Sequence, residues 1–145
     1  MAPGAGLSAA LINAYRRTHY HVADQRQSFT MMIDQPCGAL QECLRRFQVA
    51  EAAYVSAWNP RSEPTDTATN DRAQRALLAE IAMHGWVALQ GEGIDPAGQW
   101  PPEPSVLVLG IPRARACELG RSYGQNAIVI VNTDDGAVPR LMLLA

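Results

Sequence analysis

The sequence contains no lysine, so arginine supplies all 12 of its positive charges against 14 acidic residues, and the formal net charge is -2. The absence of lysine excludes Schiff-base chemistry, a P-loop lysine and a lysine general base. The arginines also form no dense stripe of the kind that binds a phosphate backbone. We therefore expect no nucleic-acid partner.

Cysteine is scarce too: Cys37, Cys43 and Cys117 form no C-x-x-C pair, and their odd number argues against a disulfide framework. No hydrophobic run approaches the length of a membrane span, and residues 1–8 lack the charged and apolar regions of a signal peptide. These absences predict a cytoplasmic protein in a reducing compartment, with no membrane partner.

What the chain has is the composition of one globular domain: 145 residues, of which 48% are hydrophobic and 18% charged. A chain of this length buries roughly 70% of the surface that its unfolded form exposes, so it folds without disulfides or a structural metal. We expect a single domain over residues 1–145.

Helical periodicity occurs in four segments. Ser8 is a suitable N-cap for the first, Pro36 for the first position of the second, and Thr69 or Asn70 for the cap of the third. Asp71 and Arg75 would form an i,i+4 ion pair on the third helix. The predicted helices cover residues 9–17, 36–47, 70–84 and 112–123.

Strand patterns fill most of the remaining chain. Two hairpins are predicted, over residues 18–33 and 125–144, together with strands at 52–58, 86–90 and 105–111. Residues 91–104 lack periodicity and are expected to form a long loop. The pattern predicts an α+β fold: a mixed, largely antiparallel sheet of about six or seven strands, with three or four helices packed mainly on one face.

Four segments combine aromatic, amide and carboxyl side chains: AYRRTHY at 14–20, SAWNPRS at 56–62 with Asn70 after it, WPPEPS at 100–105, and GQNA at 124–127. With these segments the chain resembles a bacterial domain family of unknown function, number 3293, over nearly its whole length. Ser56 stands where threonine is expected in that family, and both residues carry a hydroxyl. The resemblance implies membership but no mechanism.

These segments follow strand ends or lie in predicted loops, where pockets form. Aromatic rings would supply flat walls, amides would hydrogen-bond a planar ligand, and Glu103 would recognise an amine or act as a base. The alternative is that the amides cap loops and helices and that Trp100 covers the core. The candidate ligand-binding residues are Tyr15, Thr18, Tyr20, Trp58, Asn59, Asn70, Trp100, Glu103, Gln125 and Asn126.

Other chemistry has less support. His19 and His21 would share one face of a strand, but two ligands do not make a metal site, and we expect neither a metal nor a cofactor. Gly91 and Gly93 are the first two glycines of a nucleotide fingerprint that lacks its third. No serine or cysteine has a recognisable activating base, so nucleophilic catalysis is not indicated.

The favoured interpretation is a binding or regulatory domain with a polar, aromatic-walled pocket for a small planar ligand. One alternative is a protein-interaction module, such as a homodimer formed through the last strand, which ends in Leu141 to Leu144. Another is an enzyme that uses Glu103 as general acid or base. We expect Glu103 to remain ionised, with its pKa lowered by a partner such as Arg16, Arg17 or Arg61.

Overall fold

The computed structural model describes residues 7–144, in which seven strands form one sheet of order β2-β1-β4-β5-β3-β6-β7. Each pair of neighbouring strands among these residues is antiparallel, so the α+β prediction is confirmed and the sheet is not mixed. Most of the segment compared with signal peptides, residues 1–6, lies outside this range. The strands are β1 (His19–Val22), β2 (Phe29–Met31), β3 (Glu51–Val55), β4 (Val87–Ile94), β5 (Glu103–Leu109), β6 (Ala127–Asn132) and β7 (Arg140–Leu143).

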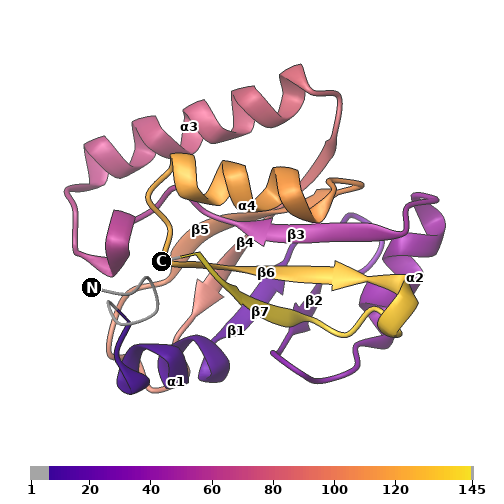
Figure 1. Cartoon of the computed structure of the whole chain (residues 1–145), viewed down its shortest axis with the longest axis horizontal. Coiled ribbons are helices and arrows are strands. Elements are labelled where there is room, and N and C mark those ends of the chain that lie inside the picture. Colours follow the sequence, from indigo (N-terminus) through magenta and orange to yellow (C-terminus); the bar gives the residue numbers. More distant parts are fainter. Residues whose placement is uncertain (1–6, 145) are drawn as a thin grey trace.

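The helices are α1 (Ala9–Arg17), α2 (Gly38–Arg46), α3 (Thr67–Met83) and α4 (Arg113–Ser122). In Figure 1, α3 and α4 lie on one side of the sheet and α1 on the other. Packing explains this division, because the central strand β3 buries Ala53 and Val55 under α3 and α4, and Ala52 and Tyr54 in a second core that includes α2. The expectation that the helices pack mainly on one face is therefore not confirmed.

Two local signals act as predicted, and a glycine ends α3. The Ser8 hydroxyl accepts a hydrogen bond from the backbone N–H of Leu11, which caps α1. Asp71 and Arg75 form an ion pair at 2.6 Å on α3. Gly85 ends that helix region with a positive φ of 77°, a conformation that glycine adopts without strain.

Two helix starts differ from the prediction. Asp66 caps α3 by accepting a hydrogen bond from the N–H of Thr69, so neither Thr69 nor Asn70 is the cap. Asn70 is instead buried within the helix. In α2 the N-cap is Cys37, one residue after Pro36, and the helix begins at Gly38.

The predicted loop at 91–104 is the largest error. β4 continues to Ile94, and β5 begins at Glu103, so only residues 95–102 connect them. Gly91 explains the error, because any Cβ there would lie 1.9 Å from the carbonyl oxygen of His21 on the paired strand β1. Glycine allows β1 and β4 to approach closely, but it also removes the side-chain alternation by which a strand is recognised.

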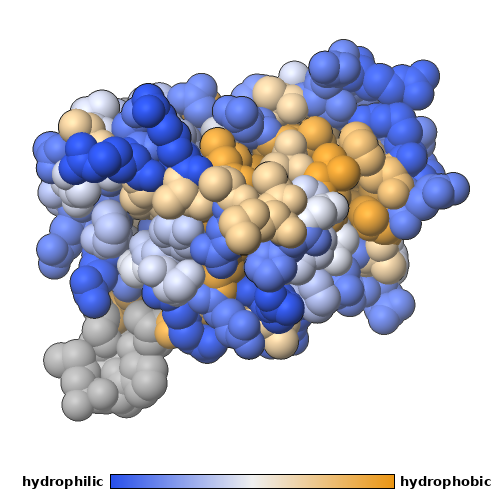
Figure 2. Space-filling view, turned by 90° about the horizontal axis from the view of Figure 1, so that it is seen from above, coloured by the Kyte–Doolittle hydropathy of each residue, from blue (hydrophilic) through white to orange (hydrophobic). Residues whose placement is uncertain are grey.

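The surface on the α3 side carries hydrophobic side chains among hydrophilic ones (Figure 2). The most exposed large hydrophobic residue is Met83 at the end of α3, with 87% of its surface accessible, and Val87 at the start of β4 follows with 46%. Within residues 7–144, no helix has both the length and the apolar character needed to cross a bilayer.

Candidate functional site

A pocket of about 390 Å³ lies at one end of the sheet, between α1 and the strands. Antiparallel pairing creates this location: Val55 at the end of β3 is paired with Val106 near the start of β5, and Glu103 is paired with Gly93 near the end of β4. Chain segments that are distant in sequence therefore leave or enter the sheet at the same end, where their loops surround the pocket.

Aromatic side chains form much of the pocket wall. Tyr15 of α1, Tyr20 of β1, Tyr54 of β3 and Trp100 of the 95–102 connection all line it. The rings of Tyr20 and Tyr54 meet edge to face with centroids 5.5 Å apart.

Backbone hydrogen bonds hold the two inner phenols. The hydroxyl of Tyr20 donates to the carbonyl of Tyr15, and that of Tyr54 donates to the carbonyl of His21, both at 2.6 Å. Burial raises the pKa of both phenols far above neutrality, so they are uncharged at physiological pH.

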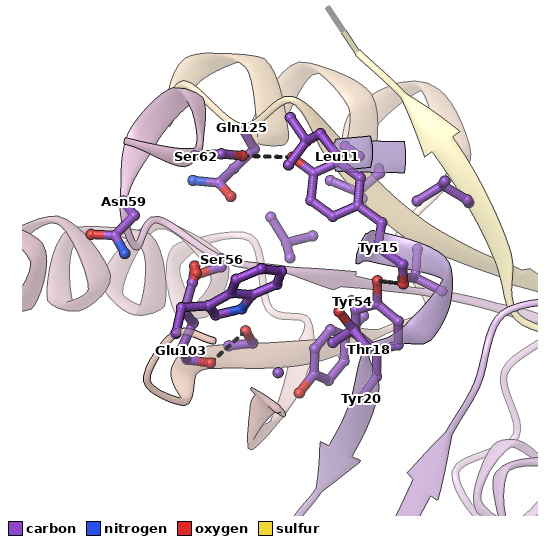
Figure 3. A pocket seen from close by; sticks show the side chains of 18 of the residues that line it. Leu11, Tyr15, Thr18, Tyr20, Tyr54, Ser56, Asn59, Ser62, Glu103 and Gln125 are labelled. Atoms are coloured by element: carbon purple, nitrogen blue, oxygen red, sulfur yellow. Dashed lines mark hydrogen bonds between the residues drawn. The ribbon is translucent and has the colours of Figure 1, made fainter. Parts of the chain in front are cut away.

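Hydrogen bonds connect the segments that were singled out from the sequence. The Ser56 hydroxyl donates to the carbonyl of Pro104 at 2.7 Å, which joins the second segment to the third. The Asn126 side chain donates to the Ser62 hydroxyl at 3.1 Å, and that hydroxyl lies 2.7 Å from the hydroxyl of Tyr15 (Figure 3). Residues from all four segments thus meet around the pocket.

The loop after β3 has an unusual backbone. Asn59, Arg61 and Ser62 have φ values of 46°, 58° and 60°, which are uncommon for residues other than glycine. Gly124 supports the loop, because its carbonyl accepts a hydrogen bond from the N–H of Arg61 at 2.7 Å. A Cβ at Gly124 would lie 2.9 Å from the Cβ of Pro60, so the two loops approach closely only because this residue is glycine.

A closed cluster of hydrogen bonds fixes the same loop, and we call it the Asn59–Asn70 cluster: Asn59, Thr65 and Asn70. The Asn59 side-chain oxygen accepts from the Thr65 N–H and from the Asn70 amide, at 3.0 and 2.8 Å. The Asn70 oxygen accepts from the Asn59 N–H at 2.9 Å. Three hydrogen bonds therefore hold Asn59 at the end of strand β3.

Glu103 has the opposite environment. It is the only charged residue among the described residues that line the pocket, and no hydrogen bond or ion pair to its carboxylate is formed within residues 7–144. Burial raises the pKa of Glu103 to about 7. The expected lowered pKa and arginine partner are wrong: Arg16, for example, pairs with Asp34 at 2.9 Å.

Two amides at the pocket also retain unused hydrogen-bonding capacity. The Gln125 nitrogen donates to the carbonyls of Trp58 and Tyr123, at 3.2 and 3.3 Å, but its oxygen accepts from no described residue. Asn59 uses its oxygen in the Asn59–Asn70 cluster, whereas its side-chain nitrogen donates to no described residue. One acceptor and one donor are therefore open to a bound molecule.

Seven of the ten candidate residues line the pocket: Tyr15, Thr18, Tyr20, Asn59, Trp100, Glu103 and Gln125. The other three support it without lining it. Asn70 is only 2% exposed within the closed cluster, Asn126 binds Ser62, and Trp58 contributes its carbonyl to Gln125.

Several residues that line the pocket were not predicted from the sequence. Ser56 and Ser62 lay inside a chosen segment, so their hydroxyls were an available signal. Tyr54 gave no signal, because in sequence it is one more residue of a buried strand. Further lining residues that were not selected include Leu11, Val55, Pro64, Gly93, Gln99, Ser105, Ile128 and Leu141.

The two neighbouring histidines lie on β1. Nδ1 of His21 is 3.4 Å from the hydroxyl of Thr30, a weak contact on the strand's less buried side. Within the described part of the chain, His, Cys, Asp and Glu side chains form no group of three or more placed to hold a metal ion.

Comparison with known proteins gives one family. No curated protein and no solved structure matches the chain. The model of a family described as a protein of unknown function, DUF3293, matches residues 55–128, which contain three of the four segments around the pocket. The match spans more than half of the chain, and the protein therefore belongs to the DUF3293 family.

Proposed function

We propose that this protein is a binding domain whose pocket takes a small planar ligand. The observation that carries the proposal is the set of unpaired polar groups at one concavity: the Glu103 carboxyl, the Gln125 oxygen and the Asn59 side-chain nitrogen. Aromatic walls beside a few converging polar groups are typical of small-molecule sites. A volume of about 390 Å³ suits a small ligand.

The hydrogen bonding in the rest of the protein supports this assignment. Among the described residues, every fully buried side-chain nitrogen or oxygen has a hydrogen-bond partner. The polar groups at the pocket that lack a hydrogen-bond partner are therefore ones that solvent or a ligand can reach. A ligand that pairs with them replaces water while its flat body covers the tyrosine and tryptophan rings.

Fragment binding tests the proposal. Isotope-labelled protein is titrated with neutral, cationic and anionic planar fragments, and backbone amide shifts are followed by NMR. We expect shifts to concentrate at Ser56, Glu103 and Gln125. If no fragment of any charge perturbs these residues, the pocket is not a ligand site.

A pocket-filling variant gives the matched control. A Cβ at Gly93 would lie 3.6 Å from the Thr18 methyl, an ordinary contact, so Gly93→Val is expected to fold while it narrows the pocket. It should weaken fragment binding. Gly38→Val, at a position with nothing within 4 Å of the added Cβ, should leave binding unchanged. If valine at position 93 prevents folding, Gly93→Ala makes a smaller version of the same test.

A second candidate function is general acid–base catalysis by Glu103. The observation in its favour is the pKa of about 7, because a group that titrates near neutrality transfers protons efficiently at physiological pH. Once a reactive ligand is found, Glu103→Gln distinguishes the two functions. A catalytic role predicts a fall in kcat of roughly 10²–10⁴-fold, whereas a binding role predicts weaker affinity with little change in kcat.

A further inference from the structure

The charge of the pocket indicates what kind of ligand it takes. Glu103 is its one ionisable carboxyl, and no arginine or histidine is found among the described residues that line it. A carboxylate in such a place is poorly solvated and lacks a counter-ion. A positively charged ligand would supply both the missing charge and the missing hydrogen-bond donors.

The aromatic walls favour the same sign of charge. The faces of tyrosine and tryptophan rings carry negative electrostatic potential and attract cations. Tyr15, Tyr20, Tyr54 and Trp100 all line the pocket. Burial raises the pKa of Tyr15 and Tyr20, and the negative charge of Glu103, which lines the same pocket, raises it further.

The remaining open acceptor suits a ligand with several N–H groups. Gln125 holds its nitrogen on two carbonyls, so its oxygen is fixed as an acceptor at the pocket. An amidine, a guanidine or a primary amine has enough N–H donors to reach both this oxygen and the Glu103 carboxylate.

We infer that the ligand is a small organic cation, an amine, amidine or guanidine on a flat apolar body, whose N–H groups bind the Glu103 carboxylate. This inference rests on the proposed binding function and names its ligand class. A neutral planar ligand would leave Glu103 without a counter-charge, and an anion would be repelled by it.

Binding of a cation is coupled to a proton. The carboxylate binds it as the ionised form, so below neutrality Glu103 releases its proton to solvent when the cation enters. The other titratable groups among the described residues that line the pocket are the phenols of Tyr15, Tyr20 and Tyr54, and all three stay neutral in this range because burial raises their pKa values. Affinity for a cation should therefore fall as the pH decreases through about 7.

Three probes of nearly identical shape test the inference: benzamidine, benzamide and benzoate, which carry positive, zero and negative charge. Binding is followed by NMR titration of pocket residues at pH 8. We expect benzamidine to bind about tenfold to a hundredfold more tightly than benzamide, as charge-assisted hydrogen bonds allow, and benzoate not to bind. At pH 5.5 the preference for benzamidine should shrink.

Glu103→Gln should remove the preference for benzamidine at pH 8. The matched control is Glu92→Gln on β4. Glu92 is an exposed acid that does not line the pocket, and its partner in the sheet, Pro104, directly follows Glu103 in the sequence. This control should retain the preference, because long-range attraction by an exposed carboxylate is screened by salt.

The outcomes separate the inference from the proposed function. If benzamide or benzoate binds at the pocket as tightly as benzamidine, or if Glu103→Gln keeps the preference, the ligand is not a cation and the inference is overturned while the binding function stands. If none of the three probes binds and the wider fragment set also leaves the pocket unperturbed, both are overturned.

Discussion

The Asn59–Asn70 cluster and the Glu103 carboxyl lie beside the same pocket, and their hydrogen bonding is opposite. In the Asn59–Asn70 cluster, side-chain oxygens accept hydrogen bonds from backbone and amide N–H groups at 2.8 to 3.0 Å. At Glu103 the carboxylate is half-buried and has no partner among residues 7–144. The Asn59–Asn70 cluster holds the wall of the pocket in place, whereas the Glu103 carboxyl is left available to a bound molecule.

The Asn59–Asn70 cluster and the Glu103 carboxyl also have opposite effects on stability. Hydrogen bonds within the first offset the strained backbone of Asn59, whose φ is 46°. The second destabilises the folded state whenever Glu103 is ionised, because burial without a partner disfavours the charge. Perturbed carboxyl groups of this kind cluster at functional sites, and the contrast between the two therefore supports the proposed binding function.

The largest effect is expected for Asn70→Ala. Asn70 is 2% exposed, and its loss leaves the N–H of Asn59 and the carbonyl of Thr65 without their partner. The free energy of unfolding should fall by about 2–3 kcal/mol, the upper part of the range for a buried group left unsatisfied, because two groups lose their partner. Urea denaturation followed by circular dichroism measures the change.

Asn13→Ala provides the control for this prediction. Asn13 is exposed on α1, so the substitution changes little beyond a small gain in helix propensity. If Asn70→Ala is as stable as the Asn13→Ala protein, the Asn59–Asn70 cluster does not stabilise the loop, and the contrast with Glu103 is lost.

The second effect has the opposite sign: Glu103→Gln should stabilise the protein at pH 8. Glutamine keeps the shape of the side chain and removes the buried charge. After allowance for partial exposure, we expect a gain of about 1–2 kcal/mol in the free energy of unfolding. Loss of stability in this variant at pH 8 would show that the carboxylate has a partner in solution.

The dependence of stability on pH provides a second test of the same prediction. The pKa of Glu103 is about 7 in the folded state and near the ordinary value of 4.5 when unfolded, so the folded state holds the proton more tightly. Its contribution to stability is full below about pH 4.5 and is lost as the pH rises to about 7. Thermal melts should show this slope in the natural protein and lack it in Glu103→Gln, while Glu92→Gln keeps it.

The sequence predicts most elements of the fold, because hydrophobic spacing is local information. The stripe of Leu40, Cys43 and Leu44 places α2 correctly, and these residues are at most 1% exposed. Which helix covers which face is not local information. Residues 52–55 of β3 are all apolar, so their sequence does not distinguish one face of the strand from the other.

The candidate site likewise contains residues that the sequence predicts and residues that it does not. Polar and aromatic residues in loops, such as Asn59 and Trp100, attract attention in sequence, whereas Tyr54 is indistinguishable from a core residue. The pKa of Glu103 could not be predicted either. This pKa depends on the absence of an arginine beside Glu103 in the folded chain. Arg16, one of the expected partners, forms its ion pair with Asp34 instead.

A smaller effect is expected for Tyr15→Phe. The Tyr15 hydroxyl lies 2.7 Å from the Ser62 hydroxyl, and its removal should lower the free energy of unfolding by about 0.5–1.5 kcal/mol. Tyr123→Phe is the matched control, because it removes a hydroxyl that donates to Glu80 at 3.0 Å, away from the pocket lining. Both variants should lose similar stability, but only Tyr15→Phe should change benzamidine affinity. An equal effect of both on affinity would show that the Tyr15 hydroxyl does not contribute to ligand binding.

The smallest expected effect is that of zinc, which should leave the melting temperature unchanged. Outside the pocket, the histidine pair on β1 is a second candidate for a functional site. His19 and His21 lie on one side of the strand, but the described residues supply no third His, Cys, Asp or Glu to complete a site, and zinc takes four ligands. A metal that binds only the folded state must raise the melting temperature by mass action, so thermal melts with zinc and with a chelator measure the point directly. A clear upward shift that disappears in His19→Ala would place a second functional site on β1. The unpaired Glu103 carboxyl would then no longer be the main candidate for function in this molecule.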